Sequence, residues 1–214
     1  MATYKHFPNI GFVEHEFTVK QLAPLRAEVE TIQADFSKAK DATHGLAGNI
    51  EKEFVLSDKT KLYLEYILMS AARAMHNNNP EYMKGDDSKM PSLYLNSAWV
   101  NFQKKHEFNP THGHTGLYSW VIWLQVPFIA EDELKSGPGA KSNHPVSGQF
   151  AFNYTDTSGH IINHGLPVDK TWENKLILFP SSLMHSVYPF YSSDDYRISV
   201  SGNFYVKETA NGKR

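Results

Sequence analysis

The chain has 214 residues, of which 41% are hydrophobic, 13% aromatic and 21% charged. This composition is typical of one folded domain and not of a disordered chain. The formal net charge of −2 provides no strong positive field, so we expect neither a nucleic acid nor a membrane as a partner. The sequence contains no cysteine, which excludes disulfides, thiolate metal sites and a cysteine nucleophile.

Targeting segments are not apparent in the sequence. Residues 1–9 are polar and contain no apolar run of the kind found in secretion signals. The most apolar run, Tyr118–Ala130, is interrupted by Gln125 and Pro127 and is too short to cross a bilayer. We therefore expect a cytoplasmic protein.

Two helices are predicted in the first third of the chain. Thr18 is a plausible N-cap for the first helix, whose apolar residues recur at spacings of three and four. These residues are Leu22, Leu25, Val29, Ile32 and Phe36. A second helix is predicted from about Asp58 to His76, and the segment Asn49–Leu56 before it is interpreted as a short connection.

From Leu93 onward the pattern is typical of short strands separated by Gly, Pro, Asn and Asp. The predicted strands are Leu93–Lys104, Tyr118–Pro127, Gly148–Tyr154, Lys175–Phe179, Ser186–Tyr191 and Arg197–Val206. The polar segment Ala130–Pro145 contains two glycines and two prolines and is predicted to be a surface loop. Helices followed by strands favour an antiparallel sandwich or barrel with helices on its outside.

Three of the 11 histidines are candidate metal ligands. His112 and His114 are two residues apart, so on an extended chain both imidazoles point to the same side. His185 follows the predicted strand that ends near Pro180. Three such ligands would occupy one face of a metal and leave the other face open for substrate or oxygen. The alternative is that these are unrelated loop or core histidines.

Polar residues alternate on two of the predicted strands. Arg197, Ser199, Ser201 and Asn203 share one face of the last strand. If that face is buried, the guanidinium needs an anionic partner, and a carboxylate matches its fork. Asn101 lies on the strand before the histidine pair and is a candidate for the same site. A solvated polar face is the alternative for both strands.

Together, the pattern His112-x-His114, then Pro180-x4-His185, then Arg197-x-Ser199 resembles the iron(II)/2-oxoglutarate-dependent dioxygenases. It is most similar to the 2-oxoglutarate oxygenases of bacteria and marine phages. Residues 46–54, 99–127 and 176–204 carry the resemblance. If the chain is encoded by a phage, the expected location is the host cytoplasm.

The resemblance implies an α+β, mainly β fold. Its core would be a double-stranded β-helix, or jelly roll, with the N-terminal helices packed on one sheet. Residues 1–214 would form a single domain, with a helical buttress at about 18–77 and the jelly-roll core at about 92–206. The oligomeric state is left open.

The resemblance also implies the cofactors and the residues that bind them. Fe(II) would be bound by His112, His114 and His185, and 2-oxoglutarate by Arg197 and Ser199, with Asn101 as a further candidate. Dioxygen would complete the reaction. The implied activity is hydroxylation of a small molecule or of a peptidyl, for example prolyl, substrate, with release of succinate and CO2.

His114 stands where most of the superfamily has Asp or Glu, so we predict a three-histidine site. One alternative is a cupin-like metalloenzyme that does not use 2-oxoglutarate. Such an enzyme needs a Glu about four residues after the histidine pair, where this chain has residues 116–119 (Gly-Leu-Tyr-Ser). Another alternative is a non-enzymatic jelly-roll binding module. His160 and His164 are surrounded by turn residues and are interpreted as surface residues.

Overall fold

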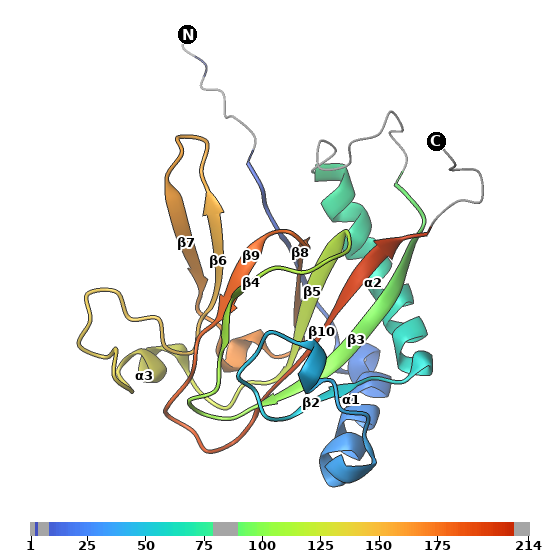
Figure 1. Cartoon of the computed structure of the whole chain (residues 1–214), viewed down its shortest axis with the longest axis horizontal. Coiled ribbons are helices and arrows are strands. Elements are labelled where there is room, and N and C mark those ends of the chain that lie inside the picture. Colours follow the sequence, from blue (N-terminus) through green and yellow to red (C-terminus); the bar gives the residue numbers. More distant parts are fainter. Residues whose placement is uncertain (1–2, 4–8, 79–89, 208–214) are drawn as a thin grey trace.

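The computed structural model describes residues 3, 9–78 and 90–207 of the chain. Three α-helices lie in this part: α1 (Val19–Ala34), α2 (Asp58–Asn78) and α3 (Ala130–Leu134). Short 3-10 turns occupy Phe36–Lys38, Thr43–Gly45 and Lys170–Trp172. The described residues outside these helices and turns form two antiparallel sheets and their connections (Figure 1).

The larger sheet has six strands in the order β1-β8-β5-β10-β3-β2. Their bounds are β1 (Val13–Glu16), β8 (Lys175–Pro180), β5 (Tyr118–Gln125), β10 (Arg197–Val206), β3 (Leu93–Gln103) and β2 (Glu53–Val55). The smaller sheet has the order β4-β9-β6-β7. Its strands are β4 (Asn109–His112), β9 (Met184–Val187), β6 (Phe150–Thr155) and β7 (Ile161–Leu166).

The path of the chain between these sheets confirms the predicted double-stranded β-helix. From β3 onward the chain passes from the large sheet to the small sheet and back, with β6 and β7 forming a hairpin in the small sheet. Strands distant in sequence therefore become neighbours, as β10 does with β3 and β5. Residues near 100 in β3 and residues near 200 in β10 are therefore neighbours in the large sheet, although they are distant in sequence.

Helix α1 forms where the sequence predicts it. The Thr18 hydroxyl accepts from Gln21 N, and the Gln21 side chain accepts from Thr18 N, which together make a capping box. Leu22, Leu25 and Val29 are buried, as the spacing predicts.

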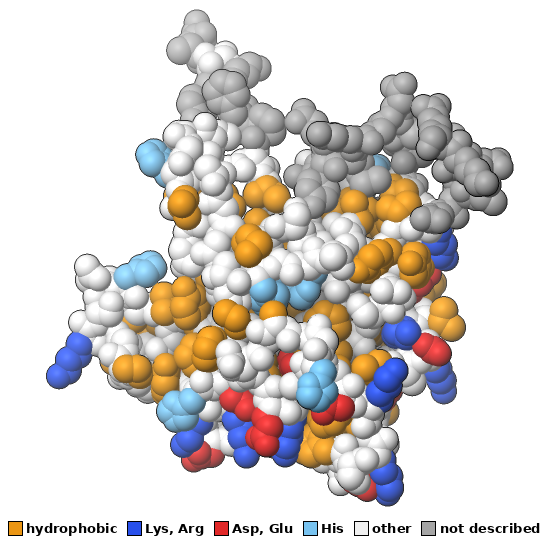
Figure 2. Space-filling view, in the orientation of Figure 1, with side chains coloured by type: hydrophobic (Ala, Val, Ile, Leu, Met, Phe, Trp, Pro, Cys, Tyr) orange, Lys and Arg blue, Asp and Glu red, His pale blue; other side chains and the backbone are white. Residues whose placement is uncertain are grey.

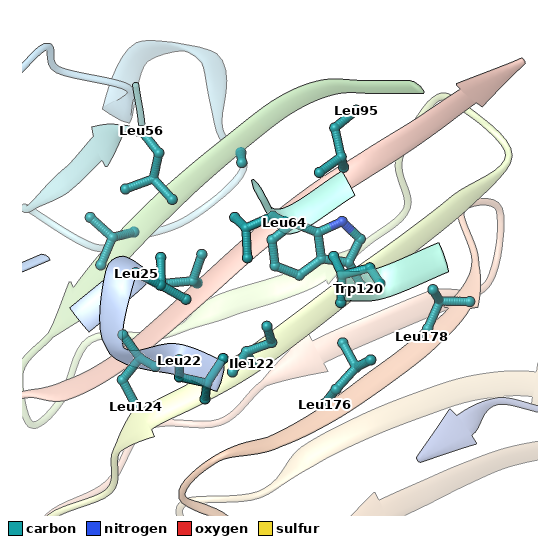
Figure 3. Close-up of a cluster of buried hydrophobic side chains, with 14 of the residues drawn as sticks. Leu22, Leu25, Leu56, Leu64, Leu95, Trp120, Ile122, Leu124, Leu176 and Leu178 are labelled. Carbon is teal, nitrogen blue, oxygen red and sulfur yellow. The ribbon is translucent and has the colours of Figure 1, made fainter. Parts of the chain in front are cut away.

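Helices α1 and α2 pack against the outer face of the large sheet. Leu22, Leu25 and Leu64 from the helices lie in one cluster with Trp120 and Ile122 of β5 (Figure 3). Each fully buried leucine contributes about 1.5–3 kcal/mol through removal of its surface from water. The helices thus close the outer face of the sheet.

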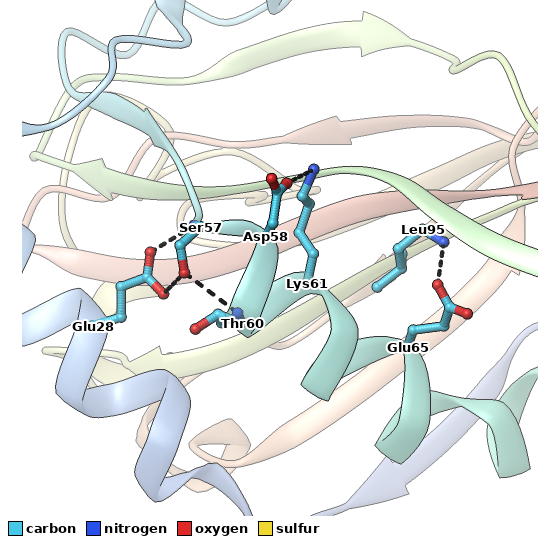
Figure 4. A network of polar contacts seen from close by, with 7 residues as sticks. All are labelled: Glu28, Ser57, Asp58, Thr60, Lys61, Glu65 and Leu95. Carbon is cyan, nitrogen blue, oxygen red and sulfur yellow. Dashed lines mark hydrogen bonds and ion pairs between the residues drawn. The ribbon is translucent and has the colours of Figure 1, made fainter.

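Polar contacts fix the two helices to each other and to the sheet (Figure 4). The carboxylate of Glu28 on α1 accepts from both the backbone N and the hydroxyl of Ser57, just before α2. Farther along α2, Glu65 accepts from Leu95 N on β3 at 3.0 Å. These contacts hold the helical layer in register with the strands beneath it.

A second apolar cluster fills the space between the two sheets. Strand β5 is buried on both faces, so its residues alternate between the two clusters: Trp120 and Ile122 join the helices, whereas Val121 and Trp123 face the small sheet. Phe150 and other aromatic residues of the small sheet meet them there. The interior between the sheets is where the candidate site lies.

Several segments differ from the sequence-based predictions. The connection Asn49–Leu56 contains β2, and the segment Ala130–Pro145 begins with α3, whose Glu133 is fully buried. His164 lies on β7 and not in a turn, although it is exposed as expected. β2 and α3 are only three and five residues long and depend on tertiary contacts, which local patterns do not report.

Candidate active site

The structure brings His112, His114 and His185 together. His112 ends β4 and lies directly opposite His185 on β9. The backbone N of His114 donates to Ser181 O at 2.8 Å, which fixes the segment after β4 to the turn that precedes His185. One potential ligand atom from each histidine lies within 4.8 Å of the others. Figure 2 shows histidine side chains near the centre of this face of the molecule, among hydrophobic groups.

The three imidazoles are neutral and therefore able to bind a metal. Burial lowers the pKa of His112, and it lowers the pKa of His114 to about 4 and that of His185 to about 3. Each ring also lies close to the others, and this further disfavours protonation of His114 and His185.

Two of the rings are held in a defined orientation. His112 Nδ1 lies 2.7 Å from Pro110 O, and His185 Nδ1 lies 3.0 Å from Leu183 O. Since a carbonyl only accepts, both Nδ1 atoms carry the proton and both Nε2 lone pairs are free. The ring of Phe150 stacks on His185 with centroids 5.3 Å apart. The donor set is thus three neutral nitrogens, two of them on rings held by hydrogen bonds, which fits a divalent transition metal.

Arg197, the first residue of β10, lines the same cavity as the three histidines and is 2% exposed. Its Nε and Nη2 donate to Gln103 Oε1, its Nη1 donates to Gly148 O, and its Nη2 also donates to Tyr188 O. Four of the five N–H groups of the guanidinium are therefore used. The remaining one, on Nη1, is available to a ligand.

The surroundings of Arg197 leave its charge largely uncompensated. The neighbouring rings of Phe128 and Phe190, whose centroids are 5.1 Å apart, lie next to the guanidinium group, 5.8 and 5.5 Å from its central carbon. Within the described residues, no carboxylate forms an ion pair with it. Burial lowers the pKa of Arg197 to about 9, an effect that the nearby Glu133 opposes. A buried cation without an anion is a site that fits the carboxylate of a ligand.

Glu133 of α3 holds the segment next to Arg197. Its carboxylate accepts from Tyr191 N at 2.7 Å and from Ser192 N at 3.0 Å. Gly148 has a φ of +73°, and a Cβ there would lie 2.9 Å from both Glu133 and Phe128. Glycine is therefore required at the position whose carbonyl accepts from Arg197.

Ser199 and Asn101 face each other across β10 and β3. Asn101 Nδ2 donates to Ser199 Oγ at 3.2 Å, so the serine hydroxyl hydrogen is free to donate to a ligand. Both residues line the cavity with Arg197 and the histidines. The structure therefore places all six candidate residues around one cavity.

Sequence reasoning assigned no role to Glu53, Gln103 or Asn109, which also line the cavity. Gln103 could have been identified from its alternation with Asn101 on the same strand. Glu53 lies on a three-residue strand that the sequence does not predict, and its burial results from pairing with Asn101 in the finished sheet.

Comparison with protein families gives one match. The model of a family described as "Putative 2OG-Fe(II) oxygenase" matches residues 97–203, which is half of the chain. The match begins in β3 and ends in β10, so it includes the three histidines, Arg197, Ser199 and Asn101. It favours the oxygenase prediction over the cupin-like and non-enzymatic alternatives. No curated protein sequence matches the chain.

Solved structures share the fold at low identity. A Pseudomonas putida prolyl-4-hydroxylase has a TM-score of 0.54 at 15% identity, with 93% of this chain and 94% of that chain covered. A Trichoplax adhaerens prolyl hydroxylase, in complex with a hypoxia inducible factor peptide fragment, has a TM-score of 0.53 at 13% identity, with 92% and 84% covered.

The α-ketoglutarate-dependent epimerase SnoN from nogalamycin biosynthesis has a TM-score of 0.56 at 11% identity, with 92% of this chain and 77% of that chain covered. An epimerase and two hydroxylases therefore share this fold, so the fold does not define the reaction outcome. Among the described residues, no helix is both long and apolar enough to span a membrane.

Proposed function

The chain belongs to the 2OG-Fe(II) oxygenase family and is an oxidoreductase that uses Fe(II), 2-oxoglutarate and dioxygen, and we propose that it hydroxylates a small-molecule or peptidyl substrate with release of succinate and CO2. The observation that carries this proposal is the convergence of three neutral histidines and one buried, uncompensated arginine on one cavity. The proposed domain is the single unit 1–214.

His112, His114 and His185 are the proposed iron ligands. Hydrogen bonds to Pro110 O and Leu183 O hold the first and third rings with Nε2 free. Because all three ligands are neutral, the site keeps the full charge of the metal. That charge would attract the carboxylate at the other end of the cosubstrate more strongly than a site containing a carboxylate ligand would.

Arg197 and Ser199 are the proposed partners of the distal carboxylate of 2-oxoglutarate. The free N–H on Arg197 Nη1 and the hydroxyl of Ser199 each donate one hydrogen bond. Asn101 positions that hydroxyl through its own bond to Ser199 Oγ. Phe128 and Phe190 exclude water from the guanidinium, which strengthens its attraction for the carboxylate.

Iron and 2-oxoglutarate together supply the oxidation: dioxygen and 2-oxoglutarate become succinate and CO2 while one oxygen atom enters a substrate C–H bond. The chain's own contribution is to hold these groups in fixed positions and to keep water away from them. Trp99, Trp123 and Phe179 form much of the apolar wall that does so.

Anaerobic titration of the apoprotein with Fe(II), and then with 2-oxoglutarate, tests the proposal. We expect a visible metal-to-ligand charge-transfer band only when both are present, followed by succinate release on addition of oxygen. His185→Ala is expected to abolish the band. His160→Ala is the matched control, because His160 is an exposed histidine of the β6–β7 hairpin. Metal binding without any 2-oxoglutarate binding would contradict the proposal.

A further inference from the structure

Glu53 is a buried carboxylate without a partner. It is 1% exposed and lines the cavity, and neither of its oxygens has a hydrogen-bond partner among the described residues. An unpaired buried polar group is costly to the folded state and is rarely retained without a reason. The position therefore indicates a ligand that supplies donors.

Two amide oxygens share this condition. Asn101 Oδ1 and Asn109 Oδ1 are buried, line the same cavity and have no partner in the described parts of the chain. The bond from Asn101 Nδ2 to the Ser199 carbonyl, at 3.5 Å, requires the amide nitrogen on that side because a carbonyl only accepts, so the oxygen faces away from Ser199. Four unpartnered atoms thus line one cavity, and all four are acceptors.

A glycine lets the Asn109 amide approach Glu53. A Cβ on Gly48 would lie 2.2 Å from Asn109 Oδ1 and 3.5 Å from Glu53 Oε1. Gly48 is not among the residues with positive φ, so its backbone does not require glycine. The absence of a side chain instead makes room for Asn109 Oδ1 itself, so that this oxygen lies near Glu53.

The charges around Glu53 favour a cation beside it. Burial raises the pKa of Glu53 to about 7, and the negative charges of Glu107 and Asp41 add to this effect. Lys52 points to the opposite face of β2, where its Nζ donates to Tyr196 and lies over the ring of Phe36. Among the described residues that line the cavity, Arg197 is the single Lys or Arg, and its bonds run to Gln103, Gly148 and Tyr188.

The position of Glu53 separates it from the proposed cosubstrate site. Glu53 pairs with Asn101, and Asn101 pairs with Ser199, so Glu53 lies two strands from Ser199. Two strand spacings are about 10 Å between backbones. The carboxylates of 2-oxoglutarate would also be repelled by an ionised Glu53.

We propose that the substrate of this enzyme carries a cationic nitrogen with N–H donors, an ammonium or a guanidinium group, and that Glu53 binds it with Asn101 and Asn109 accepting its remaining hydrogens. The proposal rests on the proposed oxygenase function, because it names the substrate class of that site. The cavity therefore binds an anionic group at Arg197 and a cationic group at Glu53.

The test is a binding titration of the Fe(II)/2-oxoglutarate-loaded protein under anaerobic conditions, followed by calorimetry. The probes are L-lysine and L-arginine with their neutral counterparts L-norleucine and L-citrulline. The Nα-acetyl methylamides of the same four compounds distinguish a free amino acid from a side chain within a peptide. We expect at least one cationic probe to bind about tenfold or more tightly than its neutral counterpart.

Three variants assign the effect to the site. Glu53→Gln is expected to remove the preference for the cation, and Gly48→Ala to weaken that preference by displacing the Asn109 amide. Glu51→Gln is the matched control, because Glu51 lies two residues away, also carries a carboxylate and is exposed. We expect it to bind all the probes as the wild type does.

Several results would overturn the inference. Equal binding of cationic and neutral probes, or no binding of any probe, would do so, as would a preference that persists in Glu53→Gln. A loss of 2-oxoglutarate affinity in Glu53→Gln would instead assign Glu53 to the cosubstrate. Failure of the oxygenase function is recognised separately, by the absence of the charge-transfer band in the wild type. If the band is absent, the same titration of the apoprotein would still show whether the protein prefers cationic to neutral probes.

Discussion

Arg197 and Glu53 are two buried charges in one cavity, and they are satisfied in opposite ways. Arg197 donates four hydrogen bonds to Gln103, Gly148 and Tyr188, whereas the oxygens of Glu53 receive none within the described chain. The difference shows that the arginine end of the cavity is organised before any ligand binds. At the glutamate end, the oxygens of Glu53 would receive hydrogen bonds only from a bound ligand. Leaving these oxygens unpaired lowers the stability of the free protein.

The largest expected effect is that of Arg197→Met, which removes the charge while keeping an apolar side chain beside Phe128 and Phe190. Three neutral acceptors lose their donor, each at a cost of about 1–3 kcal/mol, so we expect the free energy of unfolding to fall by about 3–5 kcal/mol. We also expect 2-oxoglutarate to bind about 10- to 100-fold more weakly. Urea unfolding and calorimetry measure the two effects.

Arg197→Lys keeps the charge and serves as the variant that folds if Arg197→Met does not. It cannot satisfy the same acceptors, because an ammonium lacks the fork of the guanidinium. We expect an intermediate loss of stability. A folded Arg197→Met variant that binds 2-oxoglutarate as tightly as the wild type would remove Arg197 from the site.

Glu53→Gln is expected to change stability in the opposite direction. The pKa of Glu53 is raised from 4.5 to about 7 in the folded protein, so the folded state keeps the proton to a higher pH than the unfolded state does. The wild type therefore loses stability as the pH rises from about 4.5 to 7 and not beyond.

The variant lacks this loss, so we expect it to be about 1–3 kcal/mol more stable than the wild type at pH 8 and nearly equal at pH 4.5. Urea unfolding at both pH values, with Glu51→Gln as control, measures the difference. A Glu53→Gln protein that is less stable than the wild type at pH 8 would show that Glu53 has a partner in solution.

Glu133→Gln tests whether Glu133 stabilises the segment next to Arg197 without contributing to 2-oxoglutarate binding. Glu133 accepts from the backbone of Tyr191 and Ser192 but does not line the cavity. We expect unfolding free energy to fall by about 1–3 kcal/mol, because an amide cannot accept at both positions. The affinity for 2-oxoglutarate should change by less than about threefold. A large loss of 2-oxoglutarate affinity with unchanged stability would show instead that Glu133 contributes to binding and not to stability.

The smallest expected effect is that of Ser199→Ala. Loss of one neutral donor should weaken 2-oxoglutarate binding by about 2- to 10-fold, the usual worth of a single hydrogen bond. Ser201→Ala is the matched control, because Ser201 lines the cavity one pair of residues farther along β10. Equal effects of the two substitutions would contradict the role of Ser199.

The elements that the sequence predicts well are those with a strong local pattern. Helix α1 has its N-cap and its apolar spacing, and β10 matches the predicted range Arg197–Val206. The histidine pair and His185 are recognisable as candidate metal ligands because two histidines are two residues apart and the third follows a predicted strand. Each of these patterns lies within a short stretch of sequence, so it can be recognised without knowledge of the fold.

Residues whose role depends on the finished sheet were not predictable. Glu53 reads locally as a surface glutamate, and only its pairing with Asn101 shows that it is buried. Asn109 precedes the histidine pair without any distinguishing pattern, and its contact with Gly48 joins segments 61 residues apart. In the same way, Gly148 and Tyr188 supply backbone carbonyls to Arg197, and such acceptors have no sequence signature.

The aromatic wall of the cavity has a consequence for how the protein responds to light. The sequence has four tryptophans: Trp99 and Trp123 line the cavity, Trp172 packs edge-on against Trp123 at 5.3 Å, and Trp120 faces the helices from the same strand as Trp123. The ring of Trp99 lies 5.9 Å from that of His114. Indole fluorescence from this protein therefore originates largely in and beside the cavity, and we expect its quenching to report the arrival of a transition metal without any added dye.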